Sequence, residues 1–445
     1  MRLSSMASWV GVALVAWQVT GVAHACPNQG LARVDVPGTV CNDGAPMVAH
    51  YRPPTRGHEA EWLVVLEGGE ACFNTLSCLS RASSRPDLVS GSSQPSCWPA
   101  GGTAPDGIFD SSDFGDGHVV FARYCSSDNW TGDREDSSVL MRAGFGRPFA
   151  MRGHQNLVAL FNQLQDLPRL ADPDATAAPE PADIVFAGVS AGAFGMAQFI
   201  NQIPPIFPGA TVRGISDSAV YMSASDTIQM VQAVTVLDAN PLTGAPVTAA
   251  DRNTAYFGCG GGPCLPAGSL PYNDLTPGTI AGRYSYWNAQ HDPSCLAGEA
   301  WRRVGAREHV EACGDARVLY DYIDVPVFVF GFSDESHFMG NVETGRQLMI
   351  RNPGLAWNPV FWAPAYDSVV ASFRAGTQIV QNQGDIRLLG GHAGNAAFMP
   401  RAPGHTVLLE RRYFQTLVSP GGAPSSSVEQ ELTNWVGGQG RTLIH

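Results

Sequence analysis

The most specific chemical pattern in the chain is Gly188-Val189-Ser190-Ala191-Gly192, which fits the motif Gly-X-Ser-X-Gly. In this motif a serine projects from a sharp turn between a strand and a helix, and small residues are needed two positions to either side because the strand and the helix nearly touch. An apolar run over residues 183–187 precedes the motif, and residues 191–203 have a helical pattern. We therefore predict that Ser190 is the nucleophile of an acyl transfer. The alternative is a glycine-rich structural turn.

A serine nucleophile also needs backbone donors that hold the oxyanion formed during the reaction. The N–H group of Ala191, directly after the serine, is one candidate. The second donor is expected on a glycine-rich loop after an earlier strand, and Glu67-Gly68-Gly69-Glu70 follows an apolar run over residues 62–66. We predict an oxyanion hole made by Ala191 with Gly69 or Glu70. The alternative for the two glycines is a turn that closes the strand.

The remaining triad members are expected downstream in the order acid, then histidine. Asp334 follows an apolar run over residues 325–332, and Asp217 follows another over residues 212–216. The acid normally lies several strands after the nucleophile, so Asp334 fits better than Asp217. Its neighbour Glu335 stays open as an alternative.

Three histidines could act as the general base. His337 is only three residues past Asp334, which is too close for a base carried on its own loop. His392 lies in a Gly-Gly-His-Ala-Gly segment, and His405 follows Pro-Gly just before an apolar run. The residues alone leave His392 and His405 open.

Short apolar runs that end in glycine-rich or polar turns must position these residues. They lie at residues 62–66, 118–122, 183–187, 212–216 and 325–332. Helical patterns at 153–167 and 191–203 alternate with them, which favours an α/β fold with a mostly parallel sheet. Ligands then bind at the carboxyl ends of the strands, where the motifs fall. Segments 81–117 and 223–300 are rich in loops and are expected to be insertions.

The first 25 residues have the features of an export signal. Arg2 precedes a mostly apolar stretch over residues 9–22, and Ala23-His24-Ala25 places small residues where a signal peptidase cleaves. We expect cleavage before Cys26 and a secreted or periplasmic protein. The weaker alternative is a lipoprotein acylated on Cys26, since Ala23 stands where such signals usually carry Leu. No later segment has the apolar length of a membrane span.

Ten cysteines fit an oxidising compartment. Cys72 with Cys78, and Cys259 with Cys264, have the spacing of local disulfide clips. A zinc site is the alternative for the second pair, but no other Cys or His pair has a matching spacing. We expect no metal and no other cofactor.

The net charge of −13 argues against nucleic acids and anionic membranes as partners. The expected partner is an ester substrate. We expect residues 26–445 to form a single catalytic domain, and the protein to be a monomer.

Several blocks of the chain are similar to a known family. They are the Cys-Asn-Asp-Gly-Ala-Pro run at 41–46, Leu-Glu-Gly-Gly with Cys-Phe-Asn at 66–74, Tyr-Cys-Ser-Ser-Asp-Asn-Trp-Thr-Gly at 124–132, and the Ser190 motif extended to Gly195. In these blocks the chain resembles the pectin acetylesterase and Notum family of α/β-hydrolases. The resemblance runs through most of the mature chain, and its segment Gly-His-Thr at 404–406 is similar to the family's histidine loop.

The resemblance implies an α/β-hydrolase fold and a triad of Ser190, Asp334 and His405. It implies hydrolysis of a carboxylic ester through an acyl-enzyme, first of all of small acyl groups on carbohydrate. A general carboxylesterase or lipase-like deacylase with a larger acyl pocket is the alternative, and a non-catalytic binding module is another. The chain departs from the family at Glu70, where Trp or Gly is usual, and at Gly404, near which relatives often carry Cys. These departures concern the substrate more than the chemistry.

Overall fold

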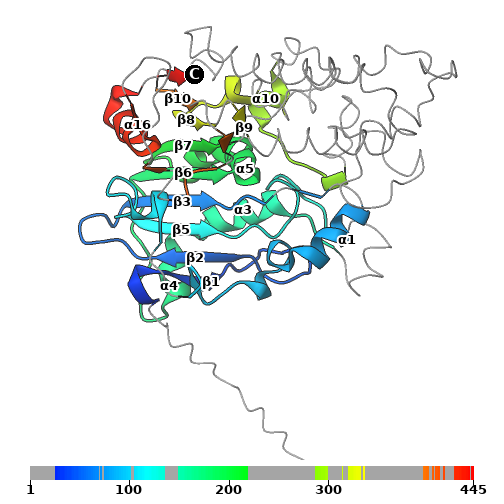
Figure 1. Ribbon diagram of the computed structural model, residues 1–445. Coiled ribbons are helices and arrows are strands. Elements are labelled where there is room, and N and C mark those ends of the chain that lie inside the picture. Colours follow the sequence, from blue (N-terminus) through cyan, green and yellow to red (C-terminus); the bar gives the residue numbers. More distant parts are fainter. Residues whose placement is uncertain are drawn as a thin grey trace, which may run out of the picture.

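A ten-stranded sheet with helices on both of its faces organises the molecule (Figure 1). The computed structural model describes residues 26–69, 71–72, 75–101, 105–135, 149–218, 286–298, 313, 319–331, 334–335, 394–399, 403–404, 406–410, 414–415, 425–440 and 442–444. In chain order the strands of the sheet are β1 (Leu31–Asp35), β2 (Val48–Arg52), β3 (Glu61–Leu66), β4 (Cys97–Trp98), β5 (His118–Ala122), β6 (Asp183–Val189), β7 (Thr211–Asp217), β8 (Val327–Phe330), β10 (Ala396–Met399) and β12 (Thr442–Ile444).

The order of the strands across the sheet is β12-β10-β8-β7-β6-β3-β5-β2-β1-β4. All pairs from β12 to β5 are parallel, whereas β2, β1 and β4 extend the sheet as an antiparallel edge. The predicted mostly parallel α/β architecture is therefore confirmed. The apolar runs predicted as strands become β3, β5, β6, β7 and β8, each within two residues of the predicted bounds.

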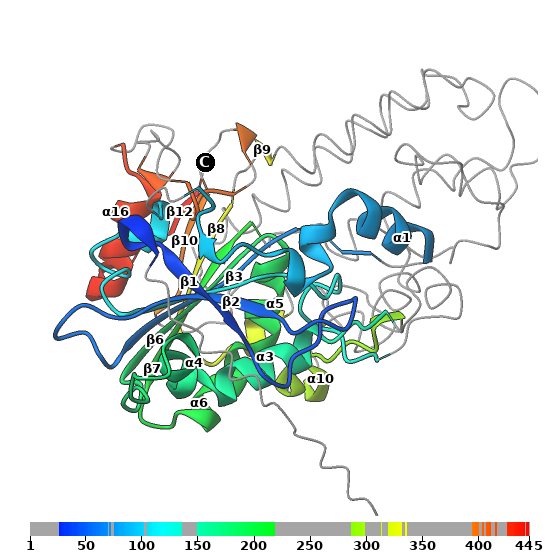
Figure 2. The same ribbon diagram turned by 90° about the horizontal axis from the view of Figure 1, so that it is seen from below.

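The central strands β3, β5, β6 and β8 are mostly apolar because both of their faces are covered. Along β3, Trp62, Val64 and Leu66 belong to one core cluster, and Leu63 and Val65 belong to the other. The first cluster packs under α3 (Gly153–Asn162), α5 (Ala191–Phe199) and α6 (Ile203–Ile206). The second packs under α16 (Val428–Asn434) and the 3₁₀ turn η4 (Gly107–Asp110), on the opposite face (Figure 2).

Prolines divide the helices that the sequence predicts as single stretches. The predicted helix at 153–167 ends at Asn162 and continues as a 3₁₀ turn and the short α4 (Leu167–Ala171), which carries Pro168 in its first turn. The predicted helix at 191–203 ends at Phe199, and α6 begins afresh with Pro204 and Pro205. Proline lacks an N–H group and fits only the first turn of a helix, so each proline marks a new start.

Segment 81–117, predicted as a loop-rich insertion, lies between β3 and β5 and consists mostly of loops and short 3₁₀ turns. It contributes β4, which pairs with β1, and η4, which covers the sheet. Of segment 223–300 the structure describes residues 286–298, with α10 (Pro293–Ala297). The extent of the domain, residues 26–445, stays a prediction.

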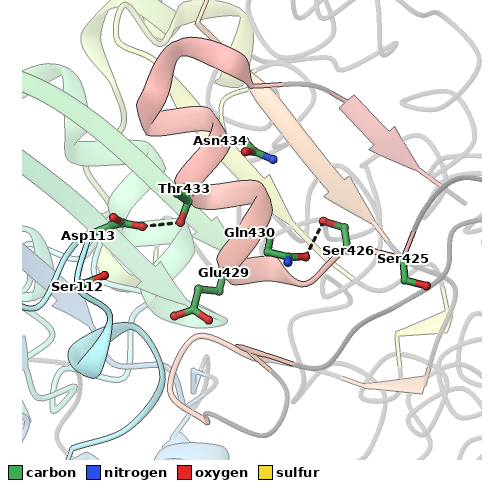
Figure 3. A pocket seen from close by; sticks show the side chains of 8 residues that line it. All are labelled: Ser112, Asp113, Ser425, Ser426, Glu429, Gln430, Thr433 and Asn434. Carbon is green, nitrogen blue, oxygen red and sulfur yellow. Dashed lines mark hydrogen bonds between the residues drawn. The ribbon is translucent and has the colours of Figure 1, made fainter.

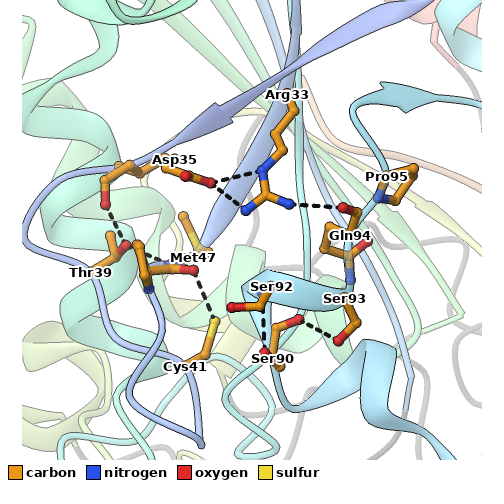
Figure 4. A network of polar contacts seen from close by, with 12 residues as sticks. Arg33, Asp35, Thr39, Cys41, Met47, Ser90, Ser92, Ser93, Gln94 and Pro95 are labelled. Carbon is orange, nitrogen blue, oxygen red and sulfur yellow. Dashed lines mark hydrogen bonds and ion pairs between the residues drawn. The ribbon is translucent and has the colours of Figure 1, made fainter. Parts of the chain in front are cut away.

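Polar contacts fasten segment 90–95 to the outer strand β1 (Figure 4). The Arg33 guanidinium donates to Asp35 at 2.9 and 2.7 Å and to the main-chain oxygen of Gln94 at 2.8 Å. In the next turn the Thr39 hydroxyl accepts the Met47 N–H at 2.8 Å. These bonds satisfy groups at a sheet edge that would otherwise be left to solvent.

Four disulfides join described residues, and two of them, at Cys26 and Cys41, lie near the same edge of the sheet. They join Cys26 to Cys97, Cys41 to Cys125, Cys72 to Cys78 and Cys295 to Cys313. The predicted clip between Cys72 and Cys78 is confirmed, while Cys259 and Cys264 lie outside the described residues. The Cys26 disulfide uses the sulfur atom that a lipid thioether would need, so it is incompatible with a lipoprotein. Within the described ranges, no helix is both long and apolar enough to cross a membrane.

His118, at the start of β5, is buried as a neutral imidazole. Its Nε2–H donates to the Glu59 carbonyl at 3.1 Å, and its Nδ1 accepts the Tyr51 hydroxyl at 2.7 Å. The Trp62 ring stacks on the imidazole, with centroids 4.0 Å apart. Burial lowers the pKa of His118 to about 4, because the cation would lose its hydration.

We expect His118 to make the fold sensitive to acid. Because its pKa is below that of an unfolded histidine, its contribution to stability is complete above about pH 6.5 and is lost as the pH falls toward 4. The loss is about 2–3 kcal/mol for this one group. Urea unfolding at pH 7 and pH 4.5 should therefore show a smaller acid-induced loss in His118→Gln than in the wild type. The exposed His58, replaced in the same way, is the control; an equal pH dependence in His118→Gln and the wild type would contradict the assignment.

Candidate active site

Ser190 occupies the sharp turn between β6 and α5 that the motif predicts. Its φ of 54° and ψ of −118° lie in a region that residues with a side chain rarely adopt. Such a conformation is unfavourable by roughly 1–3 kcal/mol and persists only where the surroundings enforce it. The side chain is 6% exposed, at the carboxyl edge of the sheet. This backbone is the one expected of a serine nucleophile.

The two motif positions admit only glycine, because a side chain at either one would collide with main-chain atoms. A Cβ atom on Gly188 would lie 2.2 Å from the carbonyl oxygen of Gly192, and a Cβ on Gly192 would lie 2.3 Å from that of Leu66. Backbone atoms cannot yield as a flexible side chain can. The end of β3, the end of β6 and the start of α5 therefore meet at a spacing that only glycine permits.

The loop after β3 lies directly beside Ser190. The chain passes from β3 to β5 on one side and later returns to β6 on the other, so this is the point where the strand order reverses and ligands bind in such sheets. A Cβ on Gly68 would come within 2.9 Å of the Ser190 Cβ. Gly69 has a φ of +136°, and any side chain there would strike Leu88.

Two of the three predicted oxyanion donors, Ala191 and Gly69, lie among the described residues near this point. Ala191 is the first residue of α5, so its N–H group has no acceptor within the helix. Gly69 follows the end of β3 by three residues, on the loop beside Ser190. Glu70 lies outside the described residues.

Glu67 anchors the start of this glycine loop. Its carboxylate accepts the Tyr124 N–H at 2.9 Å and pairs with the Arg123 guanidinium at 2.8 Å. Its carbonyl oxygen accepts the Trp130 indole N–H at 3.0 Å. Burial raises the pKa of Glu67 to about 7, with Arg123 acting in the opposite direction. The start of the glycine loop is thus held by the residues that follow the neighbouring strand β5.

The loop at 124–132 packs against the elements that carry the site, through the contacts of Trp130 with Glu67 and Gly195. Buried Asp128 accepts hydrogen bonds from the Ser126 hydroxyl at 2.6 Å, the Trp130 N–H at 3.0 Å and the Gly153 N–H at 2.7 Å. Burial raises its pKa to about 6. Ser127, like two later residues of the loop, has a positive φ. Asp128 and Ser126 thus fix this turn.

A two-stranded sheet links the regions predicted to carry the acid and the base. Strand β9 (Asp334–Glu335) pairs in parallel with β11 (Pro403–Gly404), and Asp334 is opposite Pro403. The residue after β11 is His405. The backbone of Asp334 therefore lies beside the segment that leads into His405. His337, His392 and His405 themselves lie outside the described residues.

Asp217, the competing acid in the sequence, lies at the end of β7 and is buried. Its Oδ2 accepts the N–H groups of Val407 at 2.8 Å and Leu408 at 2.9 Å, and its Oδ1 accepts the Ser218 hydroxyl at 3.0 Å. Its main-chain oxygen accepts the Ser190 N–H at 2.8 Å. The sequence carries no local signal for this role, because the partners are 190 residues apart.

A separate polar hollow of about 550 Å³ lies against α16 (Figure 3). It is lined by Ser112, Asp113, Ser425, Ser426, Glu429, Gln430, Thr433 and Asn434. None of these residues belongs to the Ser190 site. In the part of the chain that the structure describes, no three His, Cys, Asp or Glu side chains are grouped as metal ligands would be.

Residues 25–240 match the model of the pectinacetylesterase family. The match spans 216 of the 445 residues, and through that region the chain is similar to the family. The pectinacetylesterase match contains Ser190, both oxyanion-loop glycines and Asp217, and it ends before Asp334 and His405. The predicted resemblance is confirmed.

Relatives of the pectinacetylesterase region include the palmitoleoyl-protein carboxylesterase notum1' of Xenopus laevis, 27% identical over 188 residues. That alignment covers 41% of this chain and only 35% of the relative. The inactive palmitoleoyl-protein carboxylesterase notum1b of Danio rerio is 38% identical over 92 residues, which are 21% of this chain and 65% of the relative. The chain thus spans about a third of the length of the first of these relatives.

The solved structure of the Wnt deacylase Notum from Drosophila superposes on 94% of this chain and 96% of its own, with a TM-score of 0.58 and 20% sequence identity. This likeness shows the fold alone. The fold is that of an α/β-hydrolase, as predicted.

The close approach at the Ser190 turn gives a stability test. Gly192→Ala should lower the free energy of unfolding by about 3 kcal/mol or more, because its methyl group meets main-chain oxygen that cannot move aside. Gly209→Ala is the matched control, since no atom lies within 4 Å of the added methyl, and it should change stability by less than about 0.5 kcal/mol. Urea denaturation measures both. Equal stability of the two variants would refute the contact.

Proposed function

We propose that the protein hydrolyses carboxylic esters with Ser190 as nucleophile, and that its first substrates are small acyl groups, above all acetyl, on carbohydrate. The observation that carries the proposal is the strained backbone of Ser190 beside Gly68 and Gly69. A fold maintains such strain where it serves a function. The family match points to the same chemistry.

In the proposed mechanism His405 takes the Ser190 proton, and the serine oxygen attacks the ester carbonyl carbon. The C–O bond to the alcohol breaks as His405 returns the proton to the leaving oxygen, which leaves an acyl-enzyme. Water, deprotonated by the same histidine, then releases the acid. Asp334 orients the imidazole and stabilises its cation.

The proposed oxyanion hole consists of the N–H group of Ala191 and that of Gly69 or Glu70. The N-terminus of α5 supports it, because the first N–H groups of a helix point outward and carry partial positive charge. The packing of Gly68 against Ser190 also supports it, since the glycine loop then faces the serine. Each donor is worth on the order of a hundredfold in turnover.

Strand register favours His405 over His392 as the base. Strand pairing across β10, β8, β7 and β6 puts Ala396 level with Ala187, at a distance of three inter-strand spacings. Ala187 is three residues before Ser190. At about 4.8 Å between strands and 3.3 Å per residue, Gly394 is then roughly 20 Å from Ser190. Two residues span at most about 7 Å. This register therefore supports His405 rather than His392 as the base.

The charge of the protein supports a neutral substrate. The net charge is −13, and the sequence places Glu70 directly after the glycine loop. A carboxylate beside the reacting ester would repel a strongly anionic polymer. We infer that acetylated neutral carbohydrate suits the site better. The disulfides support export to the periplasm or the exterior.

The names of two relatives favour two alternative functions. The notum1' relative is named for removing a palmitoleoyl group, which favours a larger acyl pocket as the second candidate. The notum1b relative is named as inactive, which keeps a non-catalytic binding role as the third.

An ester chain-length series separates these functions. On purified protein, p-nitrophenyl acetate should be turned over faster than the butyrate, octanoate and palmitate esters. Ser190→Ala should lower kcat on the order of 10⁴-fold or more, because the nucleophile is lost. Ser92→Ala, on an exposed serine, is the control and should keep full activity. Preference for octanoate or palmitate would favour the larger pocket, and no turnover of any ester by folded protein would favour the binding role.

The two histidines are tested in the same assay. His405→Ala should lower kcat about as much as Ser190→Ala does, because members of a triad act as a unit. His392→Ala should leave kcat within about threefold of the wild type, since the strand register supports His405 as the base. The opposite ranking would identify His392 as the base.

A further inference from the structure

We propose that Asp217 is a positioning residue that holds the segment following His405 against the Ser190 turn. The inference rests on the proposed function, because it takes Ser190 and His405 as nucleophile and base. It assigns to Asp217 a role distinct from that of the triad acid.

The carboxylate of Asp217 makes a specific anchor. One oxygen, Oδ2, accepts two consecutive N–H groups, from Val407 at 2.8 Å and Leu408 at 2.9 Å. All three residues are buried, at 1% exposure or less. Hydrogen bonds to an ionised acceptor are about twice as strong as neutral ones. Without the carboxylate, two buried N–H groups would lose their acceptor.

The backbone of Asp217 is fixed to the nucleophile. Its carbonyl oxygen accepts the Ser190 N–H at 2.8 Å, and Val189 is its partner in the parallel pairing of β6 with β7. On the other side, Ser218 N–H donates to the Phe330 carbonyl at 2.9 Å, next to β8. A shift of the Asp217 backbone would therefore also move the Ser190 turn. The side chain of Asp217 in turn fixes residues 407–408 relative to that turn.

A second contact holds the same segment from the opposite side. The Leu408 carbonyl oxygen accepts the Ile108 N–H at 2.7 Å, and Gly107 packs so closely on it that a Cβ there would lie 2.1 Å away. Upstream, β11 pairs with β9. In the sequence His405 stands between β11 and Val407, so the described residues on both sides of it are anchored. Of these anchors, Asp217 is the one joined directly to Ser190.

Replacement by asparagine separates positioning from acid catalysis. In Asp217→Asn the side-chain carbonyl oxygen can still accept both N–H groups, and the new amide can donate to the Ser218 hydroxyl, which rotates to accept. An acid partner of the imidazole needs the negative charge, and asparagine removes that charge. In a Ser-His-Asp triad this change lowers kcat on the order of 10⁴-fold.

The experiment compares Asp217→Ala, Asp217→Asn and Asp334→Asn in the full-length mature protein with p-nitrophenyl acetate. We expect Asp217→Ala to lower kcat about 100-fold with little change in KM, the usual effect of a misplaced catalytic group. Asp217→Asn should stay within about tenfold of the wild type and keep the pH midpoint of kcat/KM. Asp334→Asn should lose about 10⁴-fold. Asp183→Ala, which removes a carboxylate at the start of β6, is the control for charge and should keep its activity.

Two results would overturn the inference. One is an Asp217→Ala variant within threefold of the wild type. The other is an Asp217→Asn variant as inactive as Asp334→Asn, which would make Asp217 the acid. If wild-type protein is inactive, or Ser190→Ala is not, the proposed function fails instead.

Hydrogen exchange gives a readout that needs neither activity nor the alanine variant. The amides of Val407 and Leu408 should exchange several-fold faster in Asp217→Asn than in the wild type, because the charge-assisted bonds become neutral. Amides of β3 should keep their rates. Unchanged protection at residues 407–408 would overturn the inference even if Asp217→Ala does not fold.

Discussion

The structure depends on one close approach, where the ends of β3 and β6 meet the start of α5. The carbonyl of Leu66 stands where a side chain on Gly192 would lie, and Gly192 in turn excludes any side chain on Gly188. This spacing forces the backbone of Ser190 into its strained conformation and brings Gly68 against it. Because all the contacts are between main-chain atoms, the geometry does not depend on side-chain rotamers.

Buried polar groups around this point keep it rigid. Glu67, Asp128 and Asp217 each direct their carboxylate oxygens to main-chain N–H groups of a neighbouring loop. A buried carboxylate without such donors would be strongly unfavourable, so each one specifies a single arrangement of its loop. The acidic residues of the core thus place the loops at the carboxyl edge of the sheet. The hydrophobic clusters determine only the stacking of the layers.

The sequence predicted the parts of the fold that local pattern determines. Residues 118–122 form β5 with the predicted bounds, because a strand covered on both faces gives a continuous apolar run, here residues 119–122. Strands β1 and β2 were not predicted, because their sequences mix polar and apolar residues and give no continuous apolar run. The sharp turn at Ser190 was predicted from the glycines of its Gly-X-Ser-X-Gly motif. The contact of Asp217 with Val407 could not be, because no local rule relates residues 190 positions apart.

The choice between His392 and His405 shows the same limit. Both histidines lie beside glycine in loop-like segments, so composition does not separate them. The proposal for His405 rests instead on the register of β10 against β8, in which the chain just before Ala396 lies toward the edge opposite to Ser190. Register is a property of the assembled sheet.

The bond between Asp217 and residues 407–408 also orders events in time. A chain emerges from synthesis N-terminus first, so the serine turn and its glycine loop are present long before the segment after β11 exists. The proposed nucleophile is thus synthesised first, and the segment next to its proposed base is among the last to be made. Such a protein would become active as an esterase only when residues 407–408 pack against Asp217. Incompletely synthesised chains would then have no esterase activity.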